Sequence, residues 1–253
     1  MTPQRYLELI EHDGRRLAEA AAAGDLDAPI PTCPGWDVRA CVVHTGQVYR
    51  HKVACIRLRR RPGDDEVEHA PPPGADEVRW FTEGLDALLA ELRAHSPADP
   101  AYSWWAPEQN VGFWYRRMAQ ESAVHRIDVE DGRGTPTPVD PELAVDGIDE
   151  VLERFLAEDW ADEPPEAWGG VDPRAGEGRT VAVRAGGRVW RSTLGPDTIP
   201  LVRDDGPADG TVAGEPEPVL LWLWGRRPDA AVSLEGDRAV LGAYRDRLVL
   251  ATQ

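Results

Sequence analysis

The spacing of the apolar residues changes once along the chain, and this change constrains the fold more than any other feature. Over about the first 155 residues, apolar side chains recur every three or four positions, which is typical of amphipathic helices. Further on, the segment TVAVRAGGRVWRSTL alternates apolar and polar residues on both sides of Gly186 and Gly187, as expected for a β-hairpin with a two-residue turn. The sequence therefore predicts a multidomain protein in which an α domain precedes an α+β domain.

The predicted helices of the first part have recognisable starts. Asp37 and Asp140 are suited to helix N-caps, because a carboxylate accepts hydrogen bonds from the free amides of a first turn, and Pro141 fits the first helical position. The predicted helices cover about residues 3–23, 38–61, 78–96, 108–131 and 141–155. The later part predicts short strands near residues 199–202 and 211–213, a buried helix over PVLLWLWG, and a strand and a helix from AVSLEGD onward. The composition changes at AEDWADEPPEAWGG, so we predict domains at residues 1–160 and 161–253.

The charge balance excludes several classes of partner. The chain has 28 basic and 45 acidic residues, a formal net charge of −17, and such a surface repels phosphate backbones and anionic lipids. No apolar run approaches the roughly 20 residues of a membrane span, and charges interrupt the opening MTPQRYLELIEHDGRR. Cys33, Cys41 and Cys55 are odd in number and lack a CxxC pair, which favours free thiols. We therefore expect a cytoplasmic protein without nucleic acid or membrane partners.

Three polar residues in the helical part form a candidate metal site. Glu121 and His125 are four residues apart, so they share one face of the fourth helix, and a buried Glu there needs a partner. His44 on the second helix lies beside the apolar stripe and could face this pair across a helix contact. Two His and one carboxylate leave a coordination position open, as in catalytic zinc sites. Zinc is the divalent metal we expect, although nickel and iron use the same ligand types.

Two alternatives to this ligand set stay open in the sequence. Arg117 lies four residues before Glu121, so an internal ion pair could compensate the buried carboxylate without any metal. Cys41 lies three residues before His44 and is another candidate ligand, which we rank below Glu121 because its surroundings are apolar.

Two sequence segments resemble the mycothiol-dependent maleylpyruvate isomerase family. They are IPTCPGWDVRACVVHTG, at the start of the second helix, and VGFWYRRMAQESAVHRIDVEDG in the fourth. The tail, which includes VLLWLWGRRPDAAVSLEGDRAVL, is similar as well. The resemblance implies a DinB-like, metal-binding, up-down helical bundle followed by a smaller α+β domain. It places the family's metal ligands on His44, Glu121 and His125. The sequence departs from the family pattern at Gln120, where relatives often have His, and at Asp37, which replaces Thr or Ser and still caps a helix.

The resemblance also implies an activity, namely a metal-dependent isomerase of the maleylpyruvate isomerase type. Mycothiol, an actinobacterial low-molecular-weight thiol, is its cofactor or cosubstrate. Because a cation favours thiolate over thiol, a metal-bound thiolate would add to a cis double bond, allow rotation and leave again. Arg117 would orient either a small anionic substrate or the ligating Glu121. Two other functions stay open, which are a mycothiol S-transferase acting on a small electrophile and a non-catalytic binding or regulatory protein.

Overall fold

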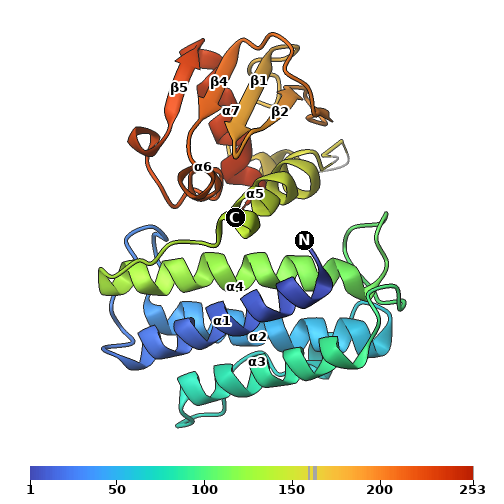
Figure 1. Cartoon of the computed structure of the whole chain (residues 1–253), viewed down its shortest axis with the longest axis vertical. Helices are drawn as coiled ribbons and strands as arrows, with labels where there is room; N and C mark the ends of the chain where they lie inside the picture. Colours follow the sequence, from blue (N-terminus) through green and yellow to red (C-terminus); the bar gives the residue numbers. More distant parts are fainter. Residues whose placement is uncertain (159, 162–163, 253) are drawn as a thin grey trace. The chain divides into compact units, whose positions relative to one another are not determined.

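Four helices pack together in the first compact unit of the protein, which spans residues 1–138. The computed structural model describes residues 1–158, 160–161 and 164–252. The helices are α1 (Pro3–Ala22), α2 (Val38–Leu58), α3 (Glu77–Ala94) and α4 (Val111–Arg133). Both α1 and α2 pack against α3 and against α4, so each helix has two close neighbours (Figure 1). This arrangement is the predicted N-terminal helical bundle.

Each helix of the bundle begins after a residue whose side chain accepts a hydrogen bond from the first turn. These caps are Thr2, Asp37, Asp76 and Asn110. The predicted cap at Asp37 is confirmed, since its carboxylate accepts from the amide of Ala40 at 2.7 Å. The fourth helix begins at Val111 and not near residue 108 as predicted, because Asn110 supplies the cap by accepting from the amide of Phe113.

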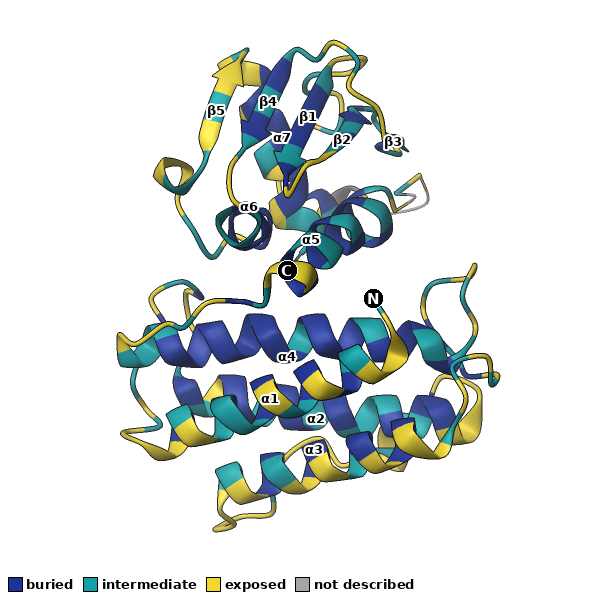
Figure 2. Ribbon diagram, in the orientation of Figure 1, coloured by how far each residue is buried: buried dark blue, intermediate teal, exposed yellow. Residues whose placement is uncertain are grey.

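Helix α4 is buried along most of its length (Figure 2). The sequence pattern predicts one apolar side for this helix, but polar residues are buried on it as well. They are Arg117, Gln120, Ser122, His125, Arg126, Asp128 and Glu130. Because a buried polar or charged group is costly unless it is paired, the contacts of these residues decide how α4 sits in the bundle.

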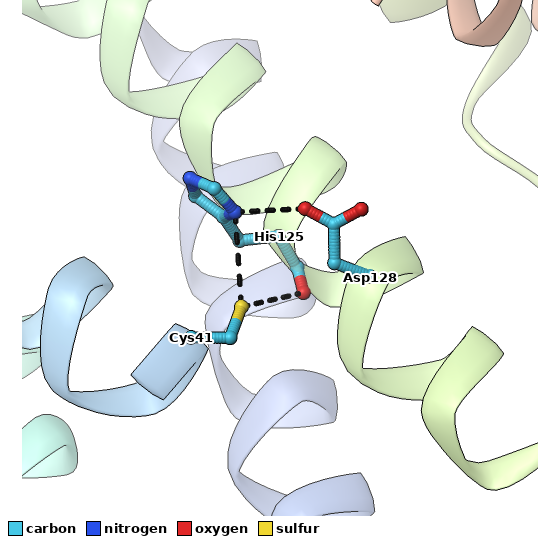
Figure 3. A group of neighbouring side chains, drawn as sticks. All are labelled: Cys41, His125 and Asp128. Atoms are coloured by element: carbon cyan, nitrogen blue, oxygen red, sulfur yellow. Dashed lines mark hydrogen bonds and ion pairs between the residues drawn. The ribbon is translucent and has the colours of Figure 1, made fainter. Parts of the chain in front are cut away.

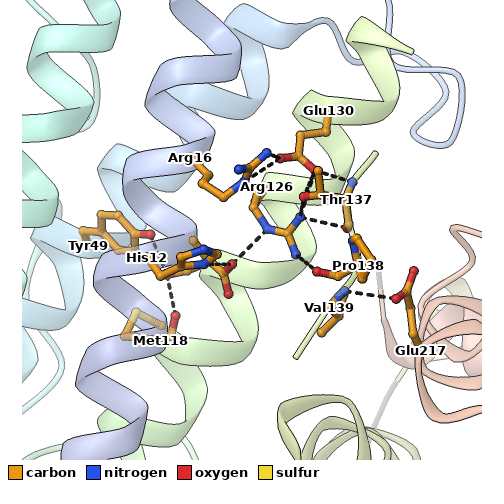
Figure 4. A network of polar contacts seen from close by, with 12 residues as sticks. His12, Arg16, Tyr49, Met118, Arg126, Glu130, Thr137, Pro138, Val139 and Glu217 are labelled. Carbon is orange, nitrogen blue, oxygen red and sulfur yellow. Dashed lines mark hydrogen bonds and ion pairs between the residues drawn. The ribbon is translucent and has the colours of Figure 1, made fainter. Parts of the chain in front are cut away.

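Arg126 connects α4 to α1 and to the segment that follows α4 (Figure 4). Its guanidinium, which is fully buried, lies 2.9 Å from the carboxylate of Asp13 and 2.8 Å from that of Glu130. It also donates to the backbone oxygens of Thr137 and Pro138, at 3.0 and 3.1 Å. Glu130 accepts in turn from the backbone amide of Thr137 at 2.8 Å. One cation therefore holds two carboxylates and the end of the first unit in place.

The second unit, which starts at Val139, contains a five-stranded sheet in the order β3-β2-β1-β4-β5. The strands are β1 (Thr180–Ala185), β2 (Arg188–Thr193), β3 (Leu201–Val202), β4 (Gly210–Ala213) and β5 (Ser233–Gly236). β1 and β4 are parallel, and the other neighbouring strands are antiparallel. The predicted hairpin is confirmed, with Gly186 and Gly187 at φ values of 55° and 73° between β1 and β2. α7 (Arg238–Ala251) packs against β1 and β4, which completes the predicted α+β fold.

The chain divides into its two compact units between Pro138 and Val139, earlier than the boundary predicted between residues 160 and 161. The difference is α5 (Pro141–Glu150), which packs against α6 (Pro216–Leu223) and so belongs to the second unit. Asp149 of α5 accepts hydrogen bonds from Trp190 of β2 at 2.9 Å and from Arg203 at 2.6 Å. The composition change used for the prediction lies within the second unit, and residues 159, 162 and 163 of that stretch lie outside the described residues.

The fifth predicted helix changes its winding before it ends. Its N-cap at Asp140 is confirmed, because the side chain accepts from the amides of Glu142 and Leu143. From Val151 to Leu156 the helix continues as a π-helix, which apolar spacing alone does not predict.

Cys33, Cys41 and Cys55 are all free and buried, as expected from their odd number and their spacing. None of the described helices combines the length and the apolar composition that a membrane span requires.

Replacement of Arg126 by Met tests the network of Figure 4. We expect the free energy of unfolding of the first unit to fall by about 3–5 kcal/mol, because Asp13 and Glu130 then stay buried without their common cation. Urea unfolding of the full chain, freed of metal with a chelator, measures the change. Arg79→Met is the matched control, since the exposed Arg79–Glu83 pair at 2.9 Å contributes no more than about 0.5 kcal/mol. Equal stability of both variants would contradict a stabilising role for the network.

Candidate metal centre

Three potential metal ligands converge where α2 contacts α4. His44 comes from α2, and Glu121 and His125 come from successive turns of α4. The Nε2 atoms of His44 and His125 lie 3.5 and 3.2 Å from Oε1 of Glu121, and the three candidate ligand atoms all lie within 4.8 Å of one another. Ligand atoms around a tetrahedral zinc ion are about 3.3 Å apart, because each zinc–nitrogen or zinc–oxygen bond is about 2.0–2.1 Å long. The spacing of these three side chains fits a small divalent cation.

Glu121 and His125 each have one further partner outside this group. Each partner binds one atom of its residue, and the other atom is directed at the centre of the group. Arg117 donates to Oε2 of Glu121 at 2.8 Å, so Oε1 is the oxygen that faces the imidazoles. Asp128 lies with Oδ2 3.0 Å from Nδ1 of His125 (Figure 3). Because an ionised carboxylate only accepts hydrogen bonds, Nδ1 carries the proton and Nε2 can offer its lone pair to a metal. A carboxylate behind a ligating His is the usual support in metal sites.

A second group of metal-binding residue types surrounds the other nitrogen of the same His125. It consists of Cys41, His125 and Asp128, with the Cys41 sulfur 3.7 Å from Nδ1 (Figure 3). All three residues are buried, and burial raises the pKa of the Cys41 thiol, which disfavours the thiolate that a metal needs. In the first group, by contrast, the side chains of His44 and Glu121 are 38% and 14% exposed. The first group is therefore the more accessible of the two to water or a substrate.

The electrostatics of the first group favour a cation at its centre. Burial alone would raise the pKa of Glu121, but His125, His44 and Arg117 together hold that pKa well below its ordinary value. Burial would likewise lower the pKa of His125, but its neighbours Cys41, Glu121 and Asp128 raise it well above the ordinary value. Without a metal, a proton on His125 therefore supplies the positive charge that Glu121 attracts. A divalent cation would replace this proton, as is general for metal binding by His.

Trp36 forms an aromatic wall beside the two imidazoles. Its ring stacks on that of His125, with centroids 6.0 Å apart, and meets the ring of His44 edge-on at 5.0 Å. Trp36 directly precedes Asp37, the N-cap of α2. Its backbone amide donates a hydrogen bond to the oxygen of Cys33, and its backbone oxygen accepts one from the amide of Ile30, which holds it in place. The sequence does not predict a role for Trp36, since a Trp before a helix cap has no spacing signal of its own.

Arg117, Gln120 and Asp128, all on α4, are the other residues at or beside the candidate site. Arg117 is buried beside Glu121, so the predicted ion pair is present next to the three candidate ligands. Gln120, which replaces a His common in the resembling family, is fully buried in α4. Asp128 was not identified from the sequence, although its position three residues after His125 on one helix face is a usable signal.

Comparison with known proteins gives two family matches and a related fold. The family model described as the mycothiol maleylpyruvate isomerase N-terminal domain matches residues 7–130, and the C-terminal domain model of the same family matches residues 142–243. The structure is similar to crystal structures of the mycothiol-dependent maleylpyruvate isomerase and of its histidine-to-alanine mutant. Their TM-scores are 0.61 and 0.60 at 12% and 11% sequence identity, and both alignments cover 93% of either chain. At this identity the likeness shows a shared fold. A search of curated proteins finds no match.

Two single substitutions distinguish the open ligand group from the buried one. His44 belongs only to the open group and Cys41 only to the buried group. We expect His44→Ala to lower bound zinc from near one equivalent toward zero, and Cys41→Ser to leave it near one equivalent, as metal analysis of the dialysed proteins would show. His125→Ala removes a member of both groups and should abolish binding, while circular dichroism checks that each variant is folded. Zinc retention in His44→Ala with loss in Cys41→Ser would assign the metal to the buried group.

Proposed function

The chain belongs to the mycothiol maleylpyruvate isomerase family, and we propose that it is a metal-dependent enzyme that isomerises a small acidic substrate with mycothiol. The observation that carries this proposal is the convergence of His44, Glu121 and His125 on one partly exposed point. Three protein ligands are the usual number in catalytic zinc sites, where the remaining position serves water or substrate, whereas structural sites use four. The solved relatives, described as mycothiol-dependent maleylpyruvate isomerase, share the fold in which this point lies.

The metal and the thiol are part of the proposal. Two imidazole nitrogens and one carboxylate oxygen suit zinc, which we propose as the metal. A bound divalent cation favours the thiolate form of a coordinated thiol, and thiolate is the nucleophilic form. In the proposed cis–trans isomerisation the thiol is released unchanged, so no redox cofactor is needed.

The residues of the chain would prepare this site in three ways. Asp128 holds the ring of His125 through Nδ1, and Arg117 holds Glu121 through Oε2, so both ligands are fixed before any cation binds. Trp36 lines the site with an apolar ring, which restricts the rotation of both imidazoles and keeps water from one side. His44, the most exposed of the three ligands, lies on the side from which a thiol and a substrate would enter.

Arg117 was predicted to orient either the substrate or Glu121, and its contacts favour the second role. It is buried, and one of its nitrogens donates to Glu121 at 2.8 Å. We therefore propose that Arg117 is a positioning residue, which acts on the reaction through the ligand that it holds.

The reaction itself is tested with zinc-loaded protein, mycothiol and maleylpyruvate. We expect a product with the mass of the substrate and a trans double bond, with the thiol recovered unchanged and no turnover by His125→Ala. Mass spectrometry and NMR of the product provide the measurement. A lasting thiol adduct would show an S-transferase in place of an isomerase. Metal and thiol binding without any turnover of either kind would support a non-catalytic protein and refute the proposal.

Replacement of Arg117 by Met tests its positioning role. We expect the dissociation constant for zinc to rise by about 10- to 100-fold, which is the usual effect of removing an outer partner of a metal ligand. Arg117→Lys should lose less affinity, because it keeps a cation near Glu121. Competition with a chromogenic chelator measures both constants. If Arg117 binds only substrate, zinc affinity should stay unchanged in both variants while the KM rises.

A further inference from the structure

Lys52 is the only lysine in the 253 residues of the sequence. The chain is strongly acidic, with a net charge of −17, and all its other Lys or Arg positions are arginines. Lys52 lies on α2, the helix that also carries His44, and it is partly buried. The contacts of its ammonium group show what balances a positive charge at this partly buried position.

Among the described residues, the contacts of the Lys52 ammonium include no carboxylate. Its Nζ lies 5.0 Å from the ring centroid of Trp114 and 3.2 Å from Nδ1 of His51. Burial, followed by the charges of Lys52 and Arg61, lowers the pKa of His51 to about 4, so His51 is neutral and accepts this hydrogen bond. One of the three N–H groups of the ammonium is thus used, and in the described part of the chain no acidic side chain forms an ion pair with it.

Arginines on the same helix differ from Lys52 in this respect. Arg50 pairs with Glu68 at 3.1 Å, and Arg57 pairs with Glu91 at 2.6 Å. An acidic protein has many carboxylates that could pair with a lysine. An ammonium that is partly buried without such a partner costs free energy. An anion that binds from solution would remove this cost.

The position of Lys52 relates it to the candidate metal centre. α2 and α4 run antiparallel along their contact, so that His44 faces Glu121 while Lys52 faces Trp114. His44, Val48, His51 and Lys52 form a partly exposed strip on α2. His44 and Lys52 are two turns apart, about 12 Å along the helix axis. Burial lowers the pKa of the Lys52 amine, the negative charge of Glu121 opposes this shift, and the positive charge of Arg117 adds to it, so Lys52 lies within electrostatic range of both residues.

We propose that Lys52 is the anion-binding residue of the active site and takes a carboxylate of the acidic substrate whose reacting carbons lie at the metal centre. This inference rests on the proposed function and adds the residue that selects the charge of the substrate. Trp114 stabilises the ammonium through its ring face, which attracts a cation without neutralising it. Two N–H groups of Lys52 are then available for the oxygens of a carboxylate.

Chemical labelling of the zinc-loaded full chain tests this assignment without any mutation. Lys52 and the terminal amine are the only primary amines of the chain, so an amine-acetylating reagent has two targets, and the terminal amine is an internal reference. The probe is succinate, an unreactive dicarboxylate, and succinamide at equal ionic strength is its neutral control. We expect succinate, but not succinamide, to slow the acetylation of Lys52 relative to the terminal amine, as followed by peptide mass spectrometry. Equal rates with and without succinate would overturn the proposal.

Two variants provide an independent measurement. We expect Lys52→Met to weaken succinate binding about tenfold to a hundredfold, because a charge-assisted hydrogen bond is lost, while Lys52→Arg stays within a few-fold of the wild type. Calorimetry measures the affinity, and metal analysis should show one equivalent of zinc in all three proteins. Succinate binding by Lys52→Met at wild-type affinity would overturn the assignment.

The outcomes separate this inference from the proposed function. If the proposed function fails, the wild type shows no thiol-dependent turnover whichever residue occupies position 52. If only the inference fails, turnover persists in Lys52→Met with an unchanged KM for the acidic substrate. A raised KM with intact zinc content, reversed in Lys52→Arg, supports both.

Discussion

The pairing of charged groups inside α4 is the constraint on which the first unit depends. A helix that is buried along most of its length would ordinarily be apolar, but α4 buries arginine, histidine and acidic side chains. Each of them would cost several kcal/mol if it were unpaired. Arg126 is paired with Asp13 and Glu130, and Arg117 is paired with Glu121. The position of α4 against its neighbours is therefore determined by matched charges as well as by apolar packing.

The candidate metal centre follows from the same rule. Glu121 is compensated on one oxygen by Arg117, and the other oxygen faces two imidazoles. Asp128 fixes the ring of His125 from behind, and Trp36 stacks on its face. The Arg117–Glu121 ion pair, predicted as an alternative to a metal, thus lies beside the candidate ligands and leaves Oε1 of Glu121 facing the imidazoles. A prepared site of this kind needs little rearrangement to accept a cation, which is how outer partners usually increase metal affinity.

Much of the fold could be predicted from the sequence, because its signals are local. Helix spacing, the caps at Asp37 and Asp140 and the turn at Gly186 and Gly187 each depend on a few neighbouring residues, and the structure confirms them. The juxtaposition of His44 with Glu121 and His125 was also predicted, partly from a family resemblance. The domain boundary was misplaced because composition does not show that α5 packs on α6.

Residues that act over long sequence distances were harder to identify. The partner of Arg126 in α1, Asp13, lies 113 positions earlier and has no periodic relation to it. Trp36 faces His125 from the segment before α2, and Lys52 faces Trp114 across the contact of α2 with α4; sequence spacing specifies neither contact. That Lys52 is the only lysine is evident from the sequence, but that no acidic side chain of the described residues pairs with it is not.

The adjacency of His125 and Arg126 has a mechanical consequence. Consecutive residues of an α-helix point about 100° apart, so one side chain is directed at α2 and the next at α1 and the backbone of Thr137 and Pro138. These two residues hold α4 from two directions at a single level and prevent it from turning about its own axis. A twist of the helix would move the imidazole of His125, a candidate ligand, away from Glu121 and His44, and at the same time move the guanidinium of Arg126 away from its acceptors. The contacts of these two residues therefore resist rotation of α4 about its axis at the level where the cation is proposed to bind.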